Sequence, residues 1–430
     1  MSAPPIRPRD PLRWHLVLTL AFLVLVCVRL TVPSILYFDE VHYVPAARTM
    51  LELSAPRNVE HPPLGKELLA LGMALFGDRP LGWRIMPALL GTLTLFAAMR
   101  AVWFANCSRG ASLLTGLFLA TGFHLLVQAR IAMLDIFMVG FLMLALWMGA
   151  GAMREPETAR WRLALAGAAL GASMAAKWNA VPLAMLPGLA FLALRLRATG
   201  WRFATSRRGA PVPGMRLAEA FVWLGLVPLA VYAACYWPFP LYARSEPYFE
   251  GANYFASLVE LHRRMLELQM QVLEPHPYQS TWSQWVINRR AIWYLYEPVD
   301  GAQRGVLLVG NPLTMLAGLP ALGWCAWAGI ARRRADAGAV ALLYAVSLGM
   351  WIVAPKSVQF YYHYLLSSCF LLAALALATD ALWRRGQRLV PGALVLGSVG
   401  LFAFYYPILT SAPLPGEAAF HRWTWLDSWQ

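Results

Sequence analysis

The sequence is poor in charge and in cysteine, and it has no nucleotide-binding signature. Only 13% of its 430 residues are charged, against roughly 25% in soluble domains, which excludes an ordinary soluble globular protein. Its 5 cysteines form no CxxC pair and most lie in apolar runs, which indicates buried small side chains. No P-loop, GxGxxG, HExxH or kinase signature occurs, and this argues against a nucleotide-driven reaction.

What the sequence has in abundance is apolar residues, which make up 59% of the chain with a mean hydropathy of +0.52. This composition is typical of an integral membrane protein. The net charge of +14 comes from short arginine clusters between apolar segments. Such clusters specify membrane topology, so we predict no nucleic-acid partner.

Hydropathy predicts an all-α polytopic fold with about eleven membrane-spanning helices. The predicted spans are 14–31, 82–103, 110–128, 132–152, 161–176, 179–196, 217–238, 305–330, 338–354, 360–382 and 390–409. The first is read as a retained helix, because no small-residue cleavage site follows it. The fifth and sixth are short and meet near Lys177.

Arginines alternate strongly between the two sets of loops. One set holds the triplet 332–334 and the clusters near 154–162, 195–216 and 384–388, whereas the short loops of the other set hold single charges. The positive-inside rule makes the first set cytoplasmic. The N-terminus is therefore predicted inside and the C-terminus outside.

Two predicted external loops are long, 32–81 and 241–304, and long loops usually carry function. The first contains "FDEVHY" (38–43) and "HPPLGK" (61–66), each followed by a stretch with apolar residues at helical spacing. Such amphipathic helices suit the membrane surface. Both loops lie on the same predicted side and could build one site.

Charged residues converge on this side at about one depth. The adjacent carboxylates of Asp39 and Glu40 are the candidate catalytic groups. Carboxylates can activate a hydroxyl, and cations can hold a leaving phosphate, so the set fits transfer from a lipid phosphate. The candidate donor-phosphate or substrate residues are Arg29, His61, Lys66, Arg84, Arg130, Asp135, Lys356 and His363.

The aromatic stretch 276–298 in the second long loop suits a membrane interface, a peptide or a sugar. We predict that Trp285 and Trp293 help to bind the acceptor, with simple membrane anchoring as the alternative. Solvated surface charges, snorkelling arginines and a structural His363 are the corresponding alternatives for the charged residues. The sequence assigns no cofactor and leaves a divalent-metal requirement open.

Several of these motifs resemble the protein O-mannosyltransferases, multispanning enzymes of the GT-C type. The resemblance lies in "VRL" (28–30), "FDEVHY", "HPPLGK", "WRIMPALLG" (83–91), "RIAMLD" (130–135), "NRRAIWYLY" (288–296), "GNP" (310–312) and "FYYHY" (360–364). It implies a catalytic region over 1–240, an external loop over 241–304 and a C-terminal four-helix region over 305–430. The short second loop cannot hold the β-trefoil domain of eukaryotic members, so the chain resembles a compact bacterial member.

The resemblance also implies an activity and a location. The donor would be a polyprenyl-phosphate mannose, the acceptor a Ser or Thr hydroxyl of an exported protein, and the site the outer face of a bacterial inner membrane. Asp39 matches the acid that acts on the acceptor, Arg29 and Arg84 match arginines needed for activity, and Asp135 matches a further acid of the family.

Two other functions remain open from the sequence alone. A GT-C relative of the aminoarabinose–lipid A type would transfer a lipid-linked sugar to a lipid or glycan. A lipid or sugar transporter would also be multispanning, but it would be expected to show internal repeats and broken helices at mid-membrane. No convincing repeat is found, and the ionisable residues gather at one surface.

Overall fold

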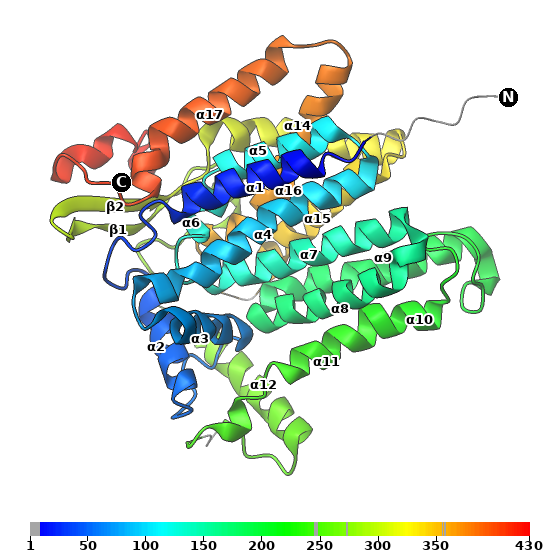
Figure 1. Cartoon of the computed structure of the whole chain (residues 1–430), viewed down its shortest axis with the longest axis horizontal. Helices are drawn as coiled ribbons and strands as arrows, with labels where there is room; N and C mark the ends of the chain where they lie inside the picture. Colours follow the sequence, from blue (N-terminus) through cyan, green and yellow to red (C-terminus); the bar gives the residue numbers. More distant parts are fainter. Residues whose placement is uncertain (1–8, 245–247, 272–273, 355, 357) are drawn as a thin grey trace.

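Apolar helices running roughly side by side make up most of the molecule (Figure 1). The computed structural model describes residues 9–244, 248–271, 274–354, 356 and 358–430. In chain order the main elements are α1 (Leu12–Cys27), α2 (Glu40–Leu51), α3 (Leu64–Phe76), α4 (Pro80–Asn106), α5 (Arg109–Thr121), α6 (His124–Gln128), α7 (Leu134–Arg154), α8 (Ala159–Ala176), α9 (Val181–Thr199), α10 (Leu217–Phe221), α11 (Val227–Ala234), α12 (Tyr254–Met270), α13 (Trp282–Val286), β1 (Ile292–Val299), β2 (Ala302–Leu308), α14 (Pro312–Ala331), α15 (Ala335–Val353), α16 (Leu365–Arg384) and α17 (Leu389–Leu409).

The polytopic helical fold predicted from hydropathy is confirmed, since every predicted span overlaps a helix. Among the described residues, 8 helical segments are long and apolar enough to cross a membrane. The predicted spans at α1, α5 and α8 are helical but shorter or less apolar, with 16, 13 and 18 residues. The total of eleven spans therefore stays a prediction.

An antiparallel hairpin is the part of the fold that the all-α prediction lacked. Strands β1 and β2 pair from Ile292–Leu308 to Val299–Ala302, with a register shift between Trp293 and Leu295. The span expected to begin at 305 begins at Pro312 instead, because residues 302–308 belong to β2.

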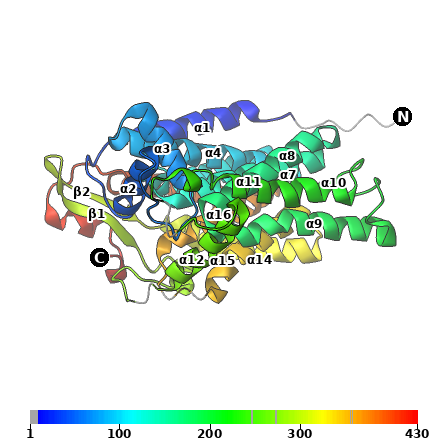
Figure 2. The ribbon, with the colours of Figure 1, turned by 90° about the horizontal axis from the view of Figure 1, so that it is seen from below.

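The bundle has a buried centre and a lipid-facing edge. In the segment Tyr361–Arg384, which contains α16, 83% of the most apolar stretch of 18 residues is buried. In the segment Leu217–Leu241, which contains α10 and α11, only 11% of the corresponding stretch is buried. Figure 1 shows α10 and α11 along the lower edge of the bundle, and Figure 2 views this edge from below. The large apolar side chains exposed on α11, such as Leu229, are therefore suited to contact lipid.

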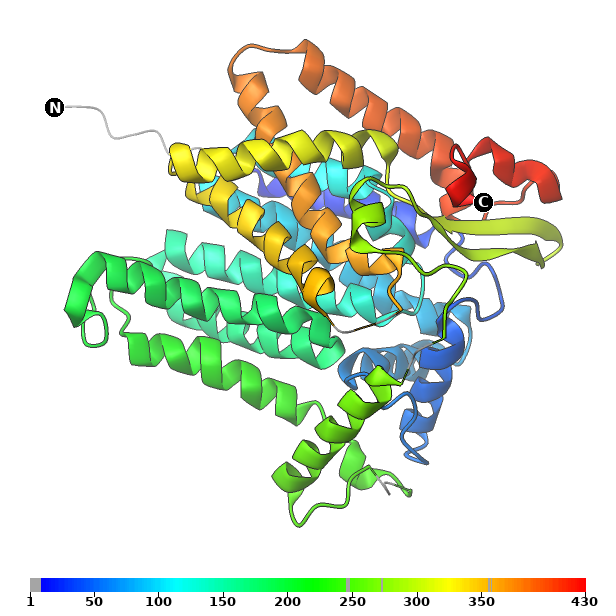
Figure 3. The ribbon, with the colours of Figure 1, turned by 180° about the vertical axis from the view of Figure 1, so that it is seen from behind.

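Both long loops and the C-terminal residues gather at one end of the bundle, which we call the loop end. It carries α2, α3, the hairpin and residues 410–430, opposite the N-terminus (Figure 1), and Figure 3 shows α13 on the same end from behind. Small residues bring α3 against α4 there, since a Cβ on Gly72 would lie 2.4 Å from the Gly82 carbonyl oxygen. This packing fixes the "HPPLGK" segment beside the start of α4.

Candidate active site

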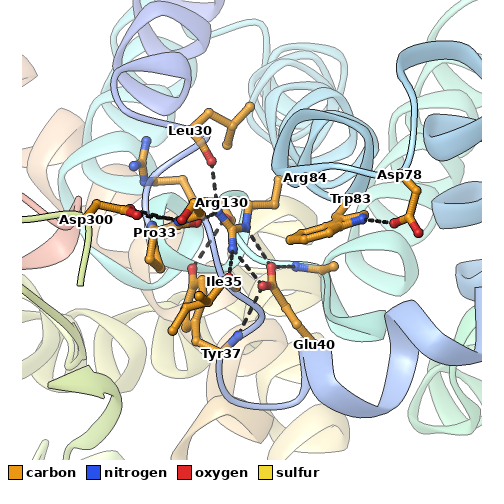
Figure 4. Close-up of polar contacts among 12 residues, drawn as sticks. Leu30, Pro33, Ile35, Tyr37, Glu40, Asp78, Trp83, Arg84, Arg130 and Asp300 are labelled. Atoms are coloured by element: carbon orange, nitrogen blue, oxygen red, sulfur yellow. Dashed lines mark hydrogen bonds and ion pairs between the residues drawn. The ribbon is translucent and has the colours of Figure 1, made fainter. Parts of the chain in front are cut away.

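Glu40 and Arg84 form a fully buried ion pair where α2 meets α4 (Figure 4). Nε and Nη2 of Arg84 each lie 2.8 Å from one Glu40 carboxylate oxygen, and neither side chain is exposed. The same carboxylate accepts the backbone N–H of Ala132 at 3.0 Å. Since Ala132 lies just before α7, Glu40 connects the first loop to both α4 and α7.

Arg84 uses every donor that a guanidinium has. Besides Glu40, it donates to the carbonyl oxygens of Leu30 at 3.3 Å, Pro33 at 2.6 Å and Ile35 at 2.9 Å. An arginine carries five N–H donors, and all are taken by protein acceptors. The geometry therefore favours a structural role for Arg84 over the predicted contact with a donor phosphate.

Arg130 and Arg29 lie at the C-terminal end of α1. Arg130 donates to the carbonyl oxygens of Val26 and Val28, which places a cation at a helix C-terminus, where it is favoured. Arg29 donates to the Thr410 carbonyl at 3.1 Å and to its hydroxyl at 2.5 Å. Nη1 of Arg29 makes no hydrogen bond to a described residue and is free to donate to a ligand.

Hydrogen bonds within the first loop hold the "HPPLGK" motif at 61–66. Nζ of the buried Lys66 donates to the carbonyl oxygens of Asn58 at 2.6 Å and His61 at 2.8 Å, and burial lowers the pKa of Lys66 to about 8. His61 lies edge-on to Tyr43 with ring centroids 6.0 Å apart. The hydrogen bonds of Lys66 therefore stabilise the conformation of the first loop. His61 contacts α2 through Tyr43.

Asp39 is the acid that the structure leaves available. Asp39 is half-buried at the start of α2, and its carboxylate makes no hydrogen bond to any described residue. Burial raises the pKa of Asp39 to about 6, and Asp135 adds to this rise while Lys177, His42 and Lys356 oppose it. A carboxylate with this pKa is mostly ionised at neutral pH and can accept a proton.

Lys177, which sequence reasoning did not include in the site, lies beside Asp135. Its Nζ is 2.7 Å from Asp135 Oδ2, with both side chains buried, and 5.2 Å from the centroid of the Tyr362 ring. The helix breaks at Lys177, whose extended backbone separates α8 from the next helical turn. The available signal was a lone lysine in an apolar stretch at a predicted helix junction.

The C-terminal half contributes Lys356 and His363 to the same region. Lys356 is half-buried, and burial together with the charge of Lys177 lowers its pKa to about 8. The His363 ring stacks on Trp351 at 3.9 Å, and its Nε2 is buried without a partner among the described residues. Lys177 and Lys356 are thus the two lysines whose charges act on Asp39.

The two tryptophans predicted to bind the acceptor are packed inside the protein. Trp285 is fully buried and donates to Ser280 Oγ at 2.8 Å. Trp293 is 9% exposed and donates to the Trp429 carbonyl at 3.0 Å. Their contacts stabilise the loop end, whereas Trp282 is the more exposed indole of this loop, at 37%.

An apolar cavity of about 290 Å³ lies among the bundle helices, toward their ends away from the loop end, since its lining reaches Ala105, Met153 and Asp336. Its lining comes from α4, α7, α8, α9, α15 and α16, and includes Val102, Leu146, Phe191, Leu343 and Phe370. Phe370 lies on α16, and His363 lies in the short 3-10 turn Tyr361–Tyr364 that leads directly into α16. The cavity and the charged site therefore share helices.

No group of three or more His, Cys, Asp or Glu side chains is arranged to hold a metal ion within the described part of the chain. The ionisable groups around Asp39 are instead the ion-paired Asp135 and Lys177, together with Lys356. This set can accept a proton and bind an anion.

This arrangement of helices is the GT-C fold of membrane glycosyltransferases. The structure of the Saccharomyces cerevisiae protein O-mannosyltransferase Pmt1-Pmt2 complex bound to the sugar donor matches with a TM-score of 0.82 and 14% identity, covering 100% of this chain and 96% of the other. ArnT from Cupriavidus metallidurans bound to undecaprenyl phosphate matches with a TM-score of 0.59 and 15% identity, covering 93% and 77%.

Sequence comparison gives the family. Residues 16–239 match the family described as dolichyl-phosphate-mannose-protein mannosyltransferase, and residues 254–429 match the C-terminal four-transmembrane region of protein O-mannosyltransferase. The chain belongs to the protein O-mannosyltransferase family and is a multi-pass membrane glycosyltransferase.

Bacterial relatives match over nearly the whole chain. The polyprenol-phosphate-mannose–protein mannosyltransferases of Mycolicibacterium smegmatis and Corynebacterium glutamicum are 28% and 27% identical to it. These matches cover 91% of this chain and 87% and 88% of the relatives.

Proposed function

We propose that the protein transfers mannose from a polyprenyl-phosphate mannose donor to Ser or Thr hydroxyls of exported proteins, on the non-cytoplasmic face of the membrane. The single observation that carries this proposal is the unpartnered carboxylate of Asp39, which is subject to the charges of Lys177 and Lys356. The family and the names of the bacterial relatives support the donor and the acceptor.

Asp39 is the proposed general base. A Ser or Thr hydroxyl is barely ionised at neutral pH, so a positioned carboxylate must take its proton as the new bond forms. The hydroxyl oxygen attacks the anomeric carbon, the proton moves to Asp39, and the bond from that carbon to the phosphate oxygen breaks. One in-line displacement of this kind inverts the anomeric centre.

The leaving polyprenyl phosphate keeps the electron pair and needs cations. Lys177 and Lys356 are the proposed phosphate ligands, because their charges act on Asp39. Asp135 would hold Lys177 in place through the 2.7 Å ion pair. Arg29 is proposed as a further phosphate ligand, since its Nη1 makes no hydrogen bond to a described residue.

The apolar cavity supports a lipid-borne donor. Its lining residues from α4, α7, α9, α15 and α16 are almost entirely apolar, which suits an isoprenoid chain and does not suit a sugar. We propose that the polyprenyl chain lies along these helices while its phosphate reaches the two lysines. A nucleotide sugar would gain nothing from this surface.

The test is a transfer assay with the purified protein in nanodiscs. Polyprenyl-phosphate [³H]mannose is offered together with a Ser/Thr-rich peptide or with lipid A. We expect label on the peptide, with inversion at the anomeric carbon. Label on lipid A alone would instead establish the lipid-acceptor activity of an ArnT-like enzyme, and no transfer to either acceptor would refute both proposals.

A further inference from the structure

Phe38, the residue before Asp39, has an unusual backbone. Its φ is 51°, in the left-handed region that a bulky non-glycine side chain rarely occupies. Strained conformations of this kind persist only where the surrounding structure holds them, and they cluster at functional sites. The contacts that hold Phe38 therefore also decide where the Asp39 carboxylate points.

Tyr294 supplies the main contact. Its ring stacks on Phe38 with centroids 4.2 Å apart and planes 28° apart, while Tyr362 meets Phe38 edge-on at 6.0 Å. Tyr294 is 4% exposed, and its hydroxyl accepts a hydrogen bond from Gln128 Nε2 at 3.1 Å. A loop residue of the N-terminal family region is thus held by a strand of the C-terminal one.

The hairpin is built irregularly where it presents this ring. The pairing of β1 with β2 passes from Trp293–Leu307 to Leu295–Val306, so Tyr294 is the extra residue at the shift. A β-bulge redirects a side chain and is common beside active sites. The neighbouring indole of Trp293 bonds to Trp429 instead, away from the Gln128 contact.

The residue after Asp39 is fixed as well. Glu40 is held by Arg84 and by the N–H of Ala132. Asp39 therefore lies between two anchored neighbours, although its own carboxylate has no described hydrogen-bond partner. An unpaired acid normally samples several rotamers, and anchoring both flanking residues limits this freedom without occupying the carboxylate.

We propose that Phe38 and Tyr294 form a positioning clamp that aims the carboxylate of Asp39 at the acceptor hydroxyl. This inference rests on the proposed role of Asp39 as the base. Tyr294 acts through Phe38 and is a positioning residue, not a catalytic one. Correct orientation of a reacting group carries a large share of enzymatic rate acceleration, and a misplacement of about 1 Å can cost about 10²-fold.

The test compares variants on the same strand. Tyr294→Leu removes the stacked ring, Tyr294→Phe keeps the ring and loses only the bond to Gln128, and Tyr296→Leu is the matched control. The Tyr296 ring packs on Phe420 at 5.4 Å, outside the clamp. Phe38→Leu removes the same stack from the other side and serves if Tyr294→Leu expresses poorly.

Three measurements are made in nanodiscs: kcat and the donor KM for mannosyl transfer, the pH dependence of kcat/KM, and hydrogen–deuterium exchange of the peptide covering residues 34–44. We expect Tyr294→Leu to lower kcat by about 10- to 100-fold with a nearly unchanged donor KM. Exchange near Asp39 should accelerate. Tyr294→Phe and Tyr296→Leu should stay close to wild type in all three measurements.

The acidic limb of the kcat/KM profile against pH distinguishes a positioning role of Tyr294 from a general loss of structure. The charged groups that act on Asp39 are Lys177, His42, Asp135 and Lys356, and none of them changes in these variants. The charge of Asp39 also acts on the hydroxyls of Tyr43, Tyr294 and Tyr362. A tyrosine hydroxyl has an ordinary pKa of about 10, and burial raises the pKa of Tyr43 and Tyr294 further, so all three stay neutral across the acidic limb. Loosening the clamp admits water to Asp39, which favours its ionised form, so the acidic limb should move to lower pH in Tyr294→Leu. An unmoved limb with kcat falling only as the folded fraction falls would refute the clamp.

The exchange measurement does not depend on the proposed reaction. Faster exchange at 34–44 in Tyr294→Leu, with no mannosyl transfer by the wild-type protein, would show that Tyr294 holds the segment around Asp39 and would refute the proposed function. Unchanged exchange and unchanged kcat in Tyr294→Leu, with normal transfer by the wild type, would refute the clamp alone.

Discussion

Replacing Arg84 by methionine is expected to destabilise the protein strongly before it affects donor binding. The substitution leaves the Glu40 carboxylate buried without its partner, and breaking a buried pair from one side costs about 3–5 kcal/mol. It also leaves three carbonyl oxygens without the bonds that Arg84 makes. We therefore expect a loss at the upper end of that range.

The other variants of the pair give a rank order. Glu40→Gln keeps a polar side chain of similar size and leaves the three carbonyl bonds of Arg84 in place, so it should cost less than Arg84→Met. The double variant should be less destabilised than the sum of the single ones, with a coupling of about 1–3 kcal/mol. Arg48→Met is the control, since its ion pair with Asp78 is exposed and such pairs are worth about 0–1 kcal/mol.

Equilibrium unfolding in mixed micelles, followed by tryptophan fluorescence, measures these differences in free energy. Donor KM is measured on the folded fraction of each variant. Stability of Arg84→Met equal to that of Arg48→Met, together with a raised donor KM, would contradict this reasoning. Arg84 would then bind the donor phosphate.

Three further predictions concern the lysines and the membrane orientation. Lys177→Met removes a positive charge that lowers the pKa of Asp39, so the acidic limb of kcat/KM should move above its wild-type position near pH 6; a limb that stays or falls would contradict this. Lys356 loses its charge above a pKa of about 8, so the donor KM should rise from pH 7 to 9 in the wild type but stay level in Lys356→Arg, because a guanidinium remains charged; a parallel rise in both proteins would exclude Lys356 as a phosphate ligand. A reporter fusion after Arg57 should report the external side of the membrane, and one after Arg334 the cytoplasmic side. A cytoplasmic signal after Arg57 would contradict the external location of the site.

Sequence patterns were sufficient for the long apolar helices, because apolar runs and their boundaries are local features, but they did not predict α12 in the second long loop. The break near Lys177 lies where the two short spans were expected to meet, with α8 ending at Ala176 and α9 starting at Val181. The amphipathic stretches after "FDEVHY" and "HPPLGK" likewise became α2 and α3.

The hairpin could not be predicted in the same way. Residues 292–296 of β1 form an unbroken apolar and aromatic run, and such a run fits a buried strand or a buried helix equally well. Strand β2 continues almost directly into α14, so hydropathy merged its residues with the following span. The pairing that defines the hairpin is a tertiary contact without a local signal.

The pairings among the predicted site residues could not be inferred from the sequence. Glu40 and Arg84 were expected on the same side, yet their direct contact joins positions 44 residues apart. Lys177 and Asp135 are separated by 42 residues, and no spacing rule connects them. Tertiary packing alone decides which cations form structural hydrogen bonds and ion pairs and which lie near Asp39.

The central claim is that Asp39 is the base of mannosyl transfer, and single-turnover kinetics of Asp39→Asn test it most directly. Donor is bound first to the purified variant and to the wild type, and the rate of mannose transfer to a Ser/Thr peptide is then followed. We predict unchanged donor binding and a rate lower by about 10²–10⁴-fold. A wild-type rate of transfer by folded Asp39→Asn would contradict the account.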